Sequence, residues 1–288
     1  MVRILFFGSA IYSVIVLKSL LEFKNAKLVG VVTKPDKPKP NPVAQFCHQT
    51  HLPLFQTEKF DPKFLKIYQD LNPDLVVVVA FGPPFFTTKM INFPRYKIVN
   101  IHPSPLPAYR GAAPAPWQII NGETTSAVTF FVIDELPDHG PIIQQIPFPI
   151  DPRETSKSFY QKAFNLAAQN TAKVLSTYCQ FPQKIVPQDE TKKSYFPRIT
   201  RDSAMIDWSW EKIKIERFIR AMNDWPIAWT IVTNQKNQQL TMKVFSAELI
   251  GNDLTLLEVQ IEGKNKTLWK EIEKYYQIDV LNTAIIRE

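Results

Sequence analysis

The chain contains 288 residues, of which 45% are hydrophobic and 21% are charged. This length predicts one large and one small domain, and the composition supplies enough apolar residues for a globular core. The sequence has 24 prolines but 8 glycines, and neither of the common glycine-rich nucleotide-binding motifs occurs in it. The low glycine content and the missing motifs therefore argue against a function that depends on a glycine-rich phosphate-binding loop.

The amino terminus is apolar, but Gly8 and Ser9 interrupt the apolar run and no small-x-small cleavage site follows it. A buried strand that leads into a helix fits this segment better than a signal peptide does. No uninterrupted apolar stretch approaches the roughly 18 residues of a membrane span. Cys47 and Cys179 make no disulfide framework, so we expect a protein of the reducing cytoplasm that does not bind membranes.

The net charge of +7 comes from the first part of the chain. Residues 1–205 contain 23 Lys and Arg against 15 Asp and Glu, whereas residues 206–288 contain 11 against 12. A basic surface suits an anionic partner such as RNA, and it suits simple solubility equally well. The charge alone leaves both explanations open.

Strand-like and helical patterns alternate along the first half of the chain. Strands are predicted at 3–8, 27–33, 74–82, 97–107 (with the loop that follows), 126–134 and 141–150, the last two as an antiparallel pair, and helices at 12–24, 61–72, 112–122 and 155–179. The β-branched run Val76–Val79 indicates strands covered on both faces, which is typical of a parallel sheet wrapped by helices. Ligands bind beyond the carboxyl ends of such strands. We therefore predict an α/β fold with its functional residues at those ends.

The pattern changes after about residue 183. The stretch 182–203 is polar, basic and contains prolines, as inter-domain linkers often do. A helix is predicted at 210–222, and strands are predicted at 229–232, 240–247 and 254–261. We therefore expect a catalytic domain at 1–183, a linker at 184–205 and a small β-rich domain at 206–288.

The densest polar cluster begins at the end of the strand predicted near residue 100. Asn100 and His102 are two residues apart, so both side chains project to one side of the strand while Ile101 faces the core. The loop that follows is stiffened by three prolines, at positions 103, 105 and 107. A second loop, at 133–141, supplies four more polar side chains: Asp134, Glu135, Asp138 and His139.

An Asn, a His and an Asp together suit acyl transfer to an amine without a covalent intermediate. The Asn amide and an imidazolium donate hydrogen bonds to the oxyanion, and a carboxylate beside the His orients it and relays a proton. Neither cysteine lies in the cluster, and Ser104 has no evident base, so a nucleophilic side chain is not indicated. The alternative from spacing alone is that these residues cap turns, as Asp138 before a Gly commonly does.

The segment NIHPSPLPAYRGAAPAPWQIINGE at 100–123 resembles the signature of the formyltransferase family. Further segments are similar to that family along nearly the whole chain: FFGSAIYSVIVLKSLL (6–21), VVTKPDKPKP (31–40), DLVVVVAFG (74–82), MIDWSW (205–210), RAMNDWPIAW (220–229) and LEVQIEGKNKTLWKE (257–271). The resemblance implies a Rossmann-like, mostly parallel sheet with helices on both faces and a reduced, OB-like β-barrel at the carboxy terminus.

The resemblance also implies a reaction and its residues. Formyl would pass from 10-formyltetrahydrofolate to the amino group of methionyl-initiator tRNA, without a metal and in a monomeric protein. Asn100, His102 and Asp138 would be catalytic. The folate co-substrate would be held by six residues: Phe81, Gly82, Ser104, Pro105, Leu106 and Pro107. A cis peptide is expected before Pro107. Substrate contacts would come from Lys34, Lys37, Lys39 and Arg110, although Arg110 fits simple packing equally well.

Three departures from the family pattern keep a second acceptor open. The loop at 104–107 reads Ser-Pro-Leu-Pro in place of Ser-Leu-Leu-Pro, so it resembles sugar N-formyltransferases as much as the tRNA enzymes. The second loop reads PDHGP, which makes Pro137 and His139 new neighbours of the Asp, and the basic loop at 34–45 is short. The near-neutral small domain adds little to phosphate binding. A sugar N-formyltransferase acting on a nucleotide-linked amino sugar is therefore the alternative, and a folate- or RNA-binding module without catalysis is a third hypothesis.

Two smaller features favour structural roles. The group Cys47, His48 and His51 has no second ligand cluster, so a solvated helix is favoured over a metal site. Four tryptophans in the small domain are expected in its core, with base stacking as the alternative: Trp208, Trp210, Trp225 and Trp229.

Overall fold

The computed structural model describes residues 1–38 and 40–280. The chain divides into two compact units. The first unit comprises Met1–Gly111, Ser126–Phe148 and Tyr160–Tyr195, and the second comprises Ala112–Thr125, Pro149–Phe159 and Phe196 onward. Two insertions from the first part of the sequence thus belong to the second unit, whereas most of the stretch predicted as a linker packs with the first.

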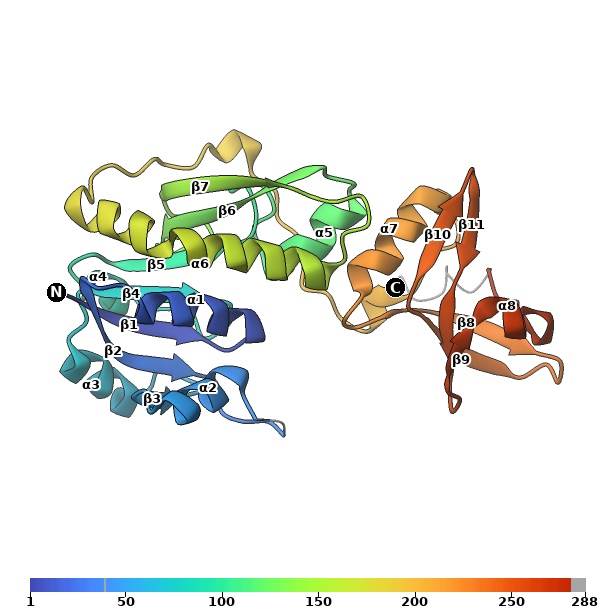
Figure 1. Ribbon diagram of the computed structural model, residues 1–288, viewed down its shortest axis with the longest axis horizontal. Coiled ribbons are helices and arrows are strands. Elements are labelled where there is room, and N and C mark those ends of the chain that lie inside the picture. Colours follow the sequence, from blue (N-terminus) through green and yellow to red (C-terminus); the bar gives the residue numbers. More distant parts are fainter. Residues whose placement is uncertain (39, 281–288) are drawn as a thin grey trace. The chain divides into compact units, whose positions relative to one another are not determined.

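The first unit is built on a seven-stranded sheet with the order β3-β2-β1-β4-β5-β6-β7 (Figure 1). Its strands are β1 (Val2–Gly8), β2 (Ala26–Thr33), β3 (Leu54–Gln56), β4 (Leu75–Val79), β5 (Ile98–His102), β6 (Thr125–Val132) and β7 (Ile142–Pro149). The strands from β3 to β5 are parallel, and β6 pairs antiparallel with β5. All five residues of β4 are buried, as the uninterrupted valine run predicts.

The helices of this unit are α1 (Ile11–Leu21), α2 (Pro42–Thr50), α3 (Pro62–Leu71), α4 (Thr88–Asn92) and α6 (Ser156–Gln180), with a short 3-10 turn at Glu190–Lys192. Asn41 and Asp61 accept hydrogen bonds from backbone N–H groups at the starts of α2 and α3, and a proline follows each as the first helical residue. Residues of α3 and α4 pack with Leu5, Phe7 and Val76 on one face of the sheet. Helix α1 contacts β1 and β4 and lies in front of the sheet in Figure 1.

The second unit combines an antiparallel five-stranded sheet, order β13-β12-β9-β8-β14, with the hairpin β10-β11. Its elements are α5 (Pro114–Ile120), a 3-10 turn (Asp202–Ala204), α7 (Lys212–Met222), β8 (Ala228–Asn234), β9 (Gln239–Val244), β10 (Ala247–Ile250), β11 (Asp253–Leu256), β12 (Glu258–Ile261), β13 (Lys266–Leu268), α8 (Trp269–Ile272), a 3-10 turn (Glu273–Tyr275) and β14 (Tyr276–Ile278). Helix α7 packs against α5 and the hairpin, with Ile215, Phe218 and Ile219 on its buried face. The predicted fold class, a mostly parallel sheet plus a small β-domain, is confirmed.

The prediction that four tryptophans lie in the core of the small domain is wrong for Trp225. Trp225 is 56% exposed, and the peptide bond that follows it, to Pro226, is cis. The other three are half-buried, and two of them donate hydrogen bonds from the indole: Trp208 to Thr230 Oγ1 at 2.8 Å and Trp229 to Arg201 O at 2.7 Å. An indole N–H needs such a partner when it leaves water. Because they are half-buried, these rings lie at the edge of the core.

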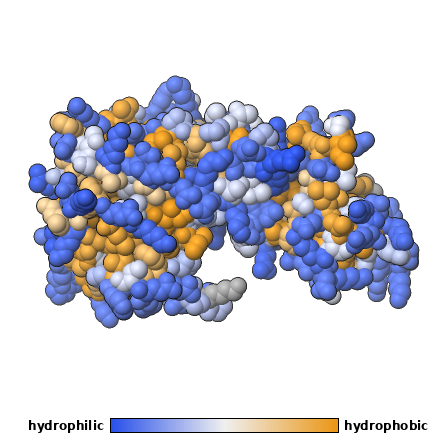
Figure 2. Space-filling view, in the orientation of Figure 1, coloured by the Kyte–Doolittle hydropathy of each residue, from blue (hydrophilic) through white to orange (hydrophobic). Residues whose placement is uncertain are grey.

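Among the described helices, including α6 with its 25 residues, none combines the length and hydropathy needed to cross a bilayer. Figure 2 shows mixed polar and apolar atoms on the face in view, with hydrophobic atoms gathered near α1 and β2 and near the tip of β10 and β11. Ile11 and Leu21 on α1 and Ile250 at the end of β10 are among the exposed apolar side chains.

Candidate active site

The carboxyl end of β5 carries the first two predicted site residues. Strand β5 lies between β4 and β6, with Asn100 opposite Val78 and Phe131 in the register. Asn100 is half-buried, Ile101 is 1% exposed, and His102 is 6% exposed. The alternation along the strand thus sends Ile101 into the core on one face and the two polar side chains to the other, as predicted from their spacing.

The structure brings Asp138 to His102 from the loop between β6 and β7. The distance from His102 Nδ1 to Asp138 Oδ1 is 3.8 Å, and Asp138 Oδ2 accepts a hydrogen bond from the N–H of Gly111 at 2.9 Å. The first distance is longer than a hydrogen bond and short enough for an ion pair with a protonated ring. The carboxylate is thus anchored through one oxygen and faces the imidazole with the other.

The second ring nitrogen of His102 fixes the tautomer. His102 Nε2 lies 3.0 Å from the carbonyl oxygen of Tyr109. Because a carbonyl only accepts, Nε2 carries a hydrogen. Proton exchange by this residue is therefore confined to Nδ1, the nitrogen that faces Asp138.

The side chains of His102 and Asp138 have hydrogen-bond partners within the protein. The side-chain amide of Asn100 has none among residues 1–38 and 40–280. A half-buried amide that the protein leaves unpaired remains able to donate to a ligand. Such a donor is what an oxyanion requires.

The loop after β5 is held rigidly by its own hydrogen bonds. Ser104 is fully buried and donates from Oγ to Ala108 O at 2.8 Å, while its carbonyl accepts from Thr129 Oγ1 at 2.6 Å. Gln145 Nε2 donates to Leu106 O at 2.6 Å. Ser104 therefore supports the loop from within instead of presenting its hydroxyl to a ligand. The supporting roles of Thr129 and Gln145 have no signature in the sequence, since both are ordinary strand residues.

The peptide bond between Leu106 and Pro107 is cis, so this expectation is confirmed. Pro105 and Pro107 are half-buried, and Leu106 is 2% exposed. The loop at 104–107 thus presents its two proline rings, more than its leucine, to its surroundings.

Phe81 and Gly82 follow the end of β4 after one intervening residue, Ala80, and lie at the same edge of the sheet as the end of β5. The ring of Phe81 is buried, with its centroid 5.2 Å from that of Phe7 and 6.3 Å from that of Phe60. Gly82 has a φ of 70°, in the left-handed region where glycine has no steric penalty. An apolar wall with a glycine at its rim is suited to an aromatic ligand.

The predicted substrate lysines make contacts within the protein. Lys34 donates to the carbonyl of Pro83 and lies 4.3 Å from the centre of the Phe81 ring. Burial lowers the pKa of Lys34, against the opposing effect of Glu58. Lys37 forms an ion pair with Glu58. Lys39 lies outside the described residues. Contacts of these three lysines with substrate remain predictions.

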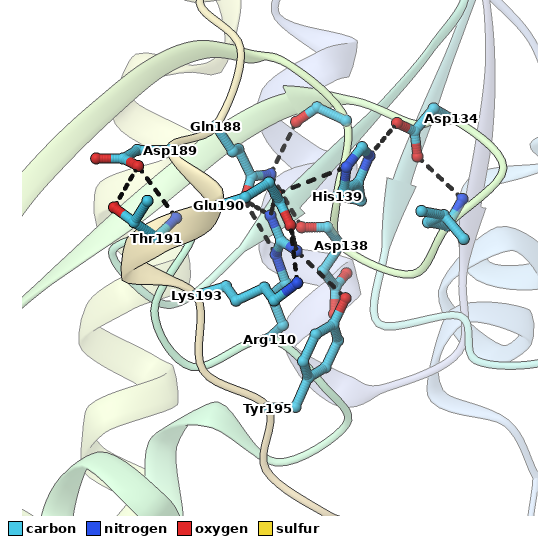
Figure 3. A network of polar contacts seen from close by, with 12 residues as sticks. Arg110, Asp134, Asp138, His139, Gln188, Asp189, Glu190, Thr191, Lys193 and Tyr195 are labelled. Atoms are coloured by element: carbon cyan, nitrogen blue, oxygen red, sulfur yellow. Dashed lines mark hydrogen bonds and ion pairs between the residues drawn. The ribbon is translucent and has the colours of Figure 1, made fainter.

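Arg110 is 1% exposed, and its guanidinium is surrounded by partners from residues 188–195 (Figure 3). It donates to Gln188 Oε1 from Nε at 3.1 Å and from Nη2 at 2.6 Å, to both carboxylate oxygens of Glu190 at 2.5 and 3.3 Å, and to the hydroxyl of Tyr195 at 3.2 Å. The structure thus favours the packing alternative for Arg110 over contact with an anionic substrate.

No cluster of His, Cys, Asp and Glu in the described part of the chain could hold a metal ion. Cys47 is buried in α2, whereas His48 and His51 are exposed, so the three side chains do not converge. Burial raises the pKa of Cys47 to about 11, which is typical of an unreactive thiol.

Residues 2–175 match the family described as Formyl transferase, and residues 198–253 match Formyl transferase, C-terminal domain. The chain belongs to the formyl transferase family. A methionyl-tRNA formyltransferase from Bacteroides fragilis is 31% identical over 277 residues, which cover 91% of this chain and 85% of the relative. Other bacterial relatives with the same name are 29 to 35% identical.

Solved structures agree on the fold. The methionyl-tRNA formyltransferase from Clostridium thermocellum superposes with a TM-score of 0.64 at 16% identity, covering 91% of this chain and 99% of that chain. A 4-N formyltransferase from Francisella tularensis gives 0.65 at 20% identity, covering 86% and 99%. HypX from Aquifex aeolicus, solved with tetrahydrofolic acid, gives 0.60 at 17% identity, covering 95% of this chain and 47% of that chain.

Proposed function

We propose that this formyl transferase moves a formyl group from 10-formyltetrahydrofolate to the amino group of methionyl-initiator tRNA, as a cytoplasmic monomer. The observation that carries the chemistry is the convergence of Asn100, His102 and Asp138, with an unpaired amide, an imidazole open at Nδ1 and an anchored carboxylate. The acceptor is supported by similarity across both units to relatives named methionyl-tRNA formyltransferase.

In this proposal each side chain has one role. Asn100 donates from its amide to the carbonyl oxygen of the formyl group as negative charge develops there. His102 takes the proton that the attacking amine loses at Nδ1 and returns one to the leaving nitrogen of the folate, so that the C–N bond broken is balanced by the C–N bond formed. Asp138 stabilises the protonated ring between these steps. Removing one such oxyanion donor typically lowers turnover about 10²–10³-fold.

The folate is proposed to lie along the edge of the sheet formed by Phe81, Gly82 and the loop at 104–107. The buried Phe81 ring and the two half-buried prolines supply apolar surface, and the pinned loop fixes its shape. HypX, which shares the fold, was solved with tetrahydrofolic acid. No metal is needed in this scheme, because the Asn100 amide stabilises the negative charge on the formyl oxygen and His102 carries the proton.

The acceptor is decided by one experiment. Labelled 10-formyltetrahydrofolate is incubated with charged initiator tRNA or with a panel of nucleotide-linked amino sugars, and the label is followed into each. We expect formylated methionyl-tRNA and unlabelled sugars. Label in a sugar with untouched tRNA would replace the proposal with the alternative that the Ser-Pro-Leu-Pro loop favours.

The catalytic residues are tested separately, under single-turnover conditions with Asn100→Ala and Asp138→Ala. Asn100→Ala is expected to transfer formyl about 10²–10³-fold more slowly than the wild type because an oxyanion donor is lost. Asp138→Ala is expected to be about 10²–10⁴-fold slower because proton transfer through His102 loses its partner. Unchanged rates in both would end the assignment and favour a binding module without catalysis by these residues.

A further inference from the structure

Residues 186–195, called the strap here, lie across both loops of the active site. Val186 exchanges two backbone hydrogen bonds with Ile142 at the start of β7, each 2.8 Å long. At the other end the N–H of Arg110 donates to Ser194 O at 2.9 Å. The sequence predicts this segment only as part of a linker. In the structure it is hydrogen-bonded to β7, which follows the loop of Asp138, and to Arg110 in the loop after β5.

Gln188 is the strap residue that reaches the loop between β6 and β7, which carries Asp138 and is called the catalytic loop here (Figure 3). Its Nε2 donates to Asp138 O at 2.9 Å and to Gly140 O at 2.8 Å, while its Oε1 accepts two hydrogen bonds from Arg110. Carbonyls only accept and guanidinium only donates, so the orientation of the amide is fixed. Both donors and both lone pairs of this side chain are therefore satisfied.

The backbone of Asp138, to which Gln188 donates a hydrogen bond, is in an unfavourable conformation. Asp138 has a φ of 51°, in the left-handed region that non-glycine residues seldom occupy. Such a conformation persists when the surrounding structure holds it, and it is enriched at functional sites. Asp138 is also the residue whose carboxylate must face His102 Nδ1, at 3.8 Å in the structure.

We propose that Gln188 is a positioning residue for formyl transfer, which holds the Asp138 backbone so that the carboxylate faces His102. This inference rests on the roles assigned above to Asp138 and His102. Gln188 touches neither residue's reacting atoms, so it acts through Asp138. The effect of such a support is large because a displacement of about 1 Å in a catalytic group can cost about 10²-fold in rate.

Arg110 and Glu190 orient the amide of Gln188. The guanidinium of Arg110 joins Gln188 to Glu190, whose Oε1 also lies 3.6 Å from His139 Nε2. His139 Nδ1 in turn lies 2.6 Å from Asp134 Oδ2 on the catalytic loop. The strap is thus linked to residues of the catalytic loop on both sides of Asp138. One of them, His139, is a position at which this sequence departs from the family pattern.

The decisive variant is Gln188→Glu. It keeps the length of the side chain and an acceptor for Arg110, but it has no N–H to donate to the carbonyls of Asp138 and Gly140. The strap is therefore expected to stay in place while the loop is released. Gln183→Glu is the matched control, because Gln183 is an exposed residue three positions before the strap and the charge change is identical.

Three measurements are made on the full chain. The first is kcat and KM for formyl transfer to methionyl-tRNA. The second is the chemical shift of the His102 ring protons, assigned by comparison with His102→Asn. This shift depends on the position of the Asp138 carboxylate and is measured without methionyl-tRNA. The third is kcat of the double variant with Asp138→Ala. Thermal unfolding establishes that each protein is folded.

We expect Gln188→Glu to lower kcat about 10²-fold with KM changed less than about twofold, and to shift the His102 signals, while Gln183→Glu does neither. In the Asp138→Ala background the same change should alter kcat less than about twofold. Unshifted His102 signals, or an equal loss of kcat in both backgrounds, would overturn the positioning role.

The two proposals fail in different ways. A wild-type protein that leaves tRNA unformylated, but whose His102 signals move in Gln188→Glu, refutes the acceptor and retains the positioning role. If Gln188→Glu shows no cooperative unfolding, Gln188→Met takes its place, since methionine has nearly the same length and neither charge nor donor, with Gln183→Met as its control.

Discussion

Gly140, two residues after Asp138, is a position where one methyl group should disturb both stability and chemistry. A Cβ there would lie 1.8 Å from Val132 O and 3.0 Å from Val132 C. A carbon and an oxygen in contact normally stay about 3.3 Å apart, so the loop must move by about 1.5 Å. The obstacle is backbone of strand β6, which cannot turn aside as a side chain would.

The cost of Gly140→Ala follows from what that movement breaks. Overpacking costs about 1–3 kcal/mol. The hydrogen bonds at risk are Val132 N to Pro141 O, 2.9 Å, and Gln188 Nε2 to Gly140 O, 2.8 Å, and each contributes about 1 kcal/mol. We expect a loss of about 3–5 kcal/mol in the free energy of unfolding, and a kcat about 10²-fold lower because Asp138 moves with the loop.

Urea unfolding and single-turnover formyl transfer measure the two effects. Gly251→Ala is the control, because Gly251 has a φ of 62° but no atom within 4 Å of the added Cβ. It should cost about 1 kcal/mol from backbone strain alone and leave kcat unchanged. A Gly140→Ala protein that is no less stable than this control, and equally active, would show that the loop moves aside at no cost and does not position Asp138.

Three further predictions address separate parts of the site. Asn100→Ala should lower kcat about 10²–10³-fold without changing the circular dichroism spectrum, since its amide supports no other residue, and Asn100→Asp should not restore activity. Arg110 holds the pKa of Glu190 below its ordinary value, so this carboxylate adds stability at neutral pH that is lost as the pH falls through its native pKa. Thermal melts should therefore separate wild type from Glu190→Gln at pH 7 and bring them together well below about pH 4; a constant difference would contradict the pairing. Burial raises the pKa of both Cys47 and Cys179 to about 11, so at pH 8 iodoacetamide should modify them about 10²-fold more slowly than a free thiol until denaturant is added; rapid labelling of the native protein would show that they are open.

Elements with local signals could be predicted from the amino-acid pattern. The valine run of β4 reports burial on both faces because a strand in a covered parallel sheet has no polar side, and the two-residue spacing of Asn100 and His102 places them on one face because strand side chains alternate. The cis bond before Pro107 followed from the resemblance of its loop to a family. The short elements β3 and α4 carry too few residues for a periodicity and were not predicted.

Contacts between groups far apart in the chain could not be predicted in this way. Nothing local indicates that Arg110 would be buried against Glu190, 80 residues away, or that Gln188 in an apparent linker would bind the carbonyl of Asp138, 50 residues away. Likewise Trp225 reads as a core residue but is exposed. Periodicity records which face of an element avoids water, whereas the partner of a buried polar group depends on how the whole chain folds back on itself.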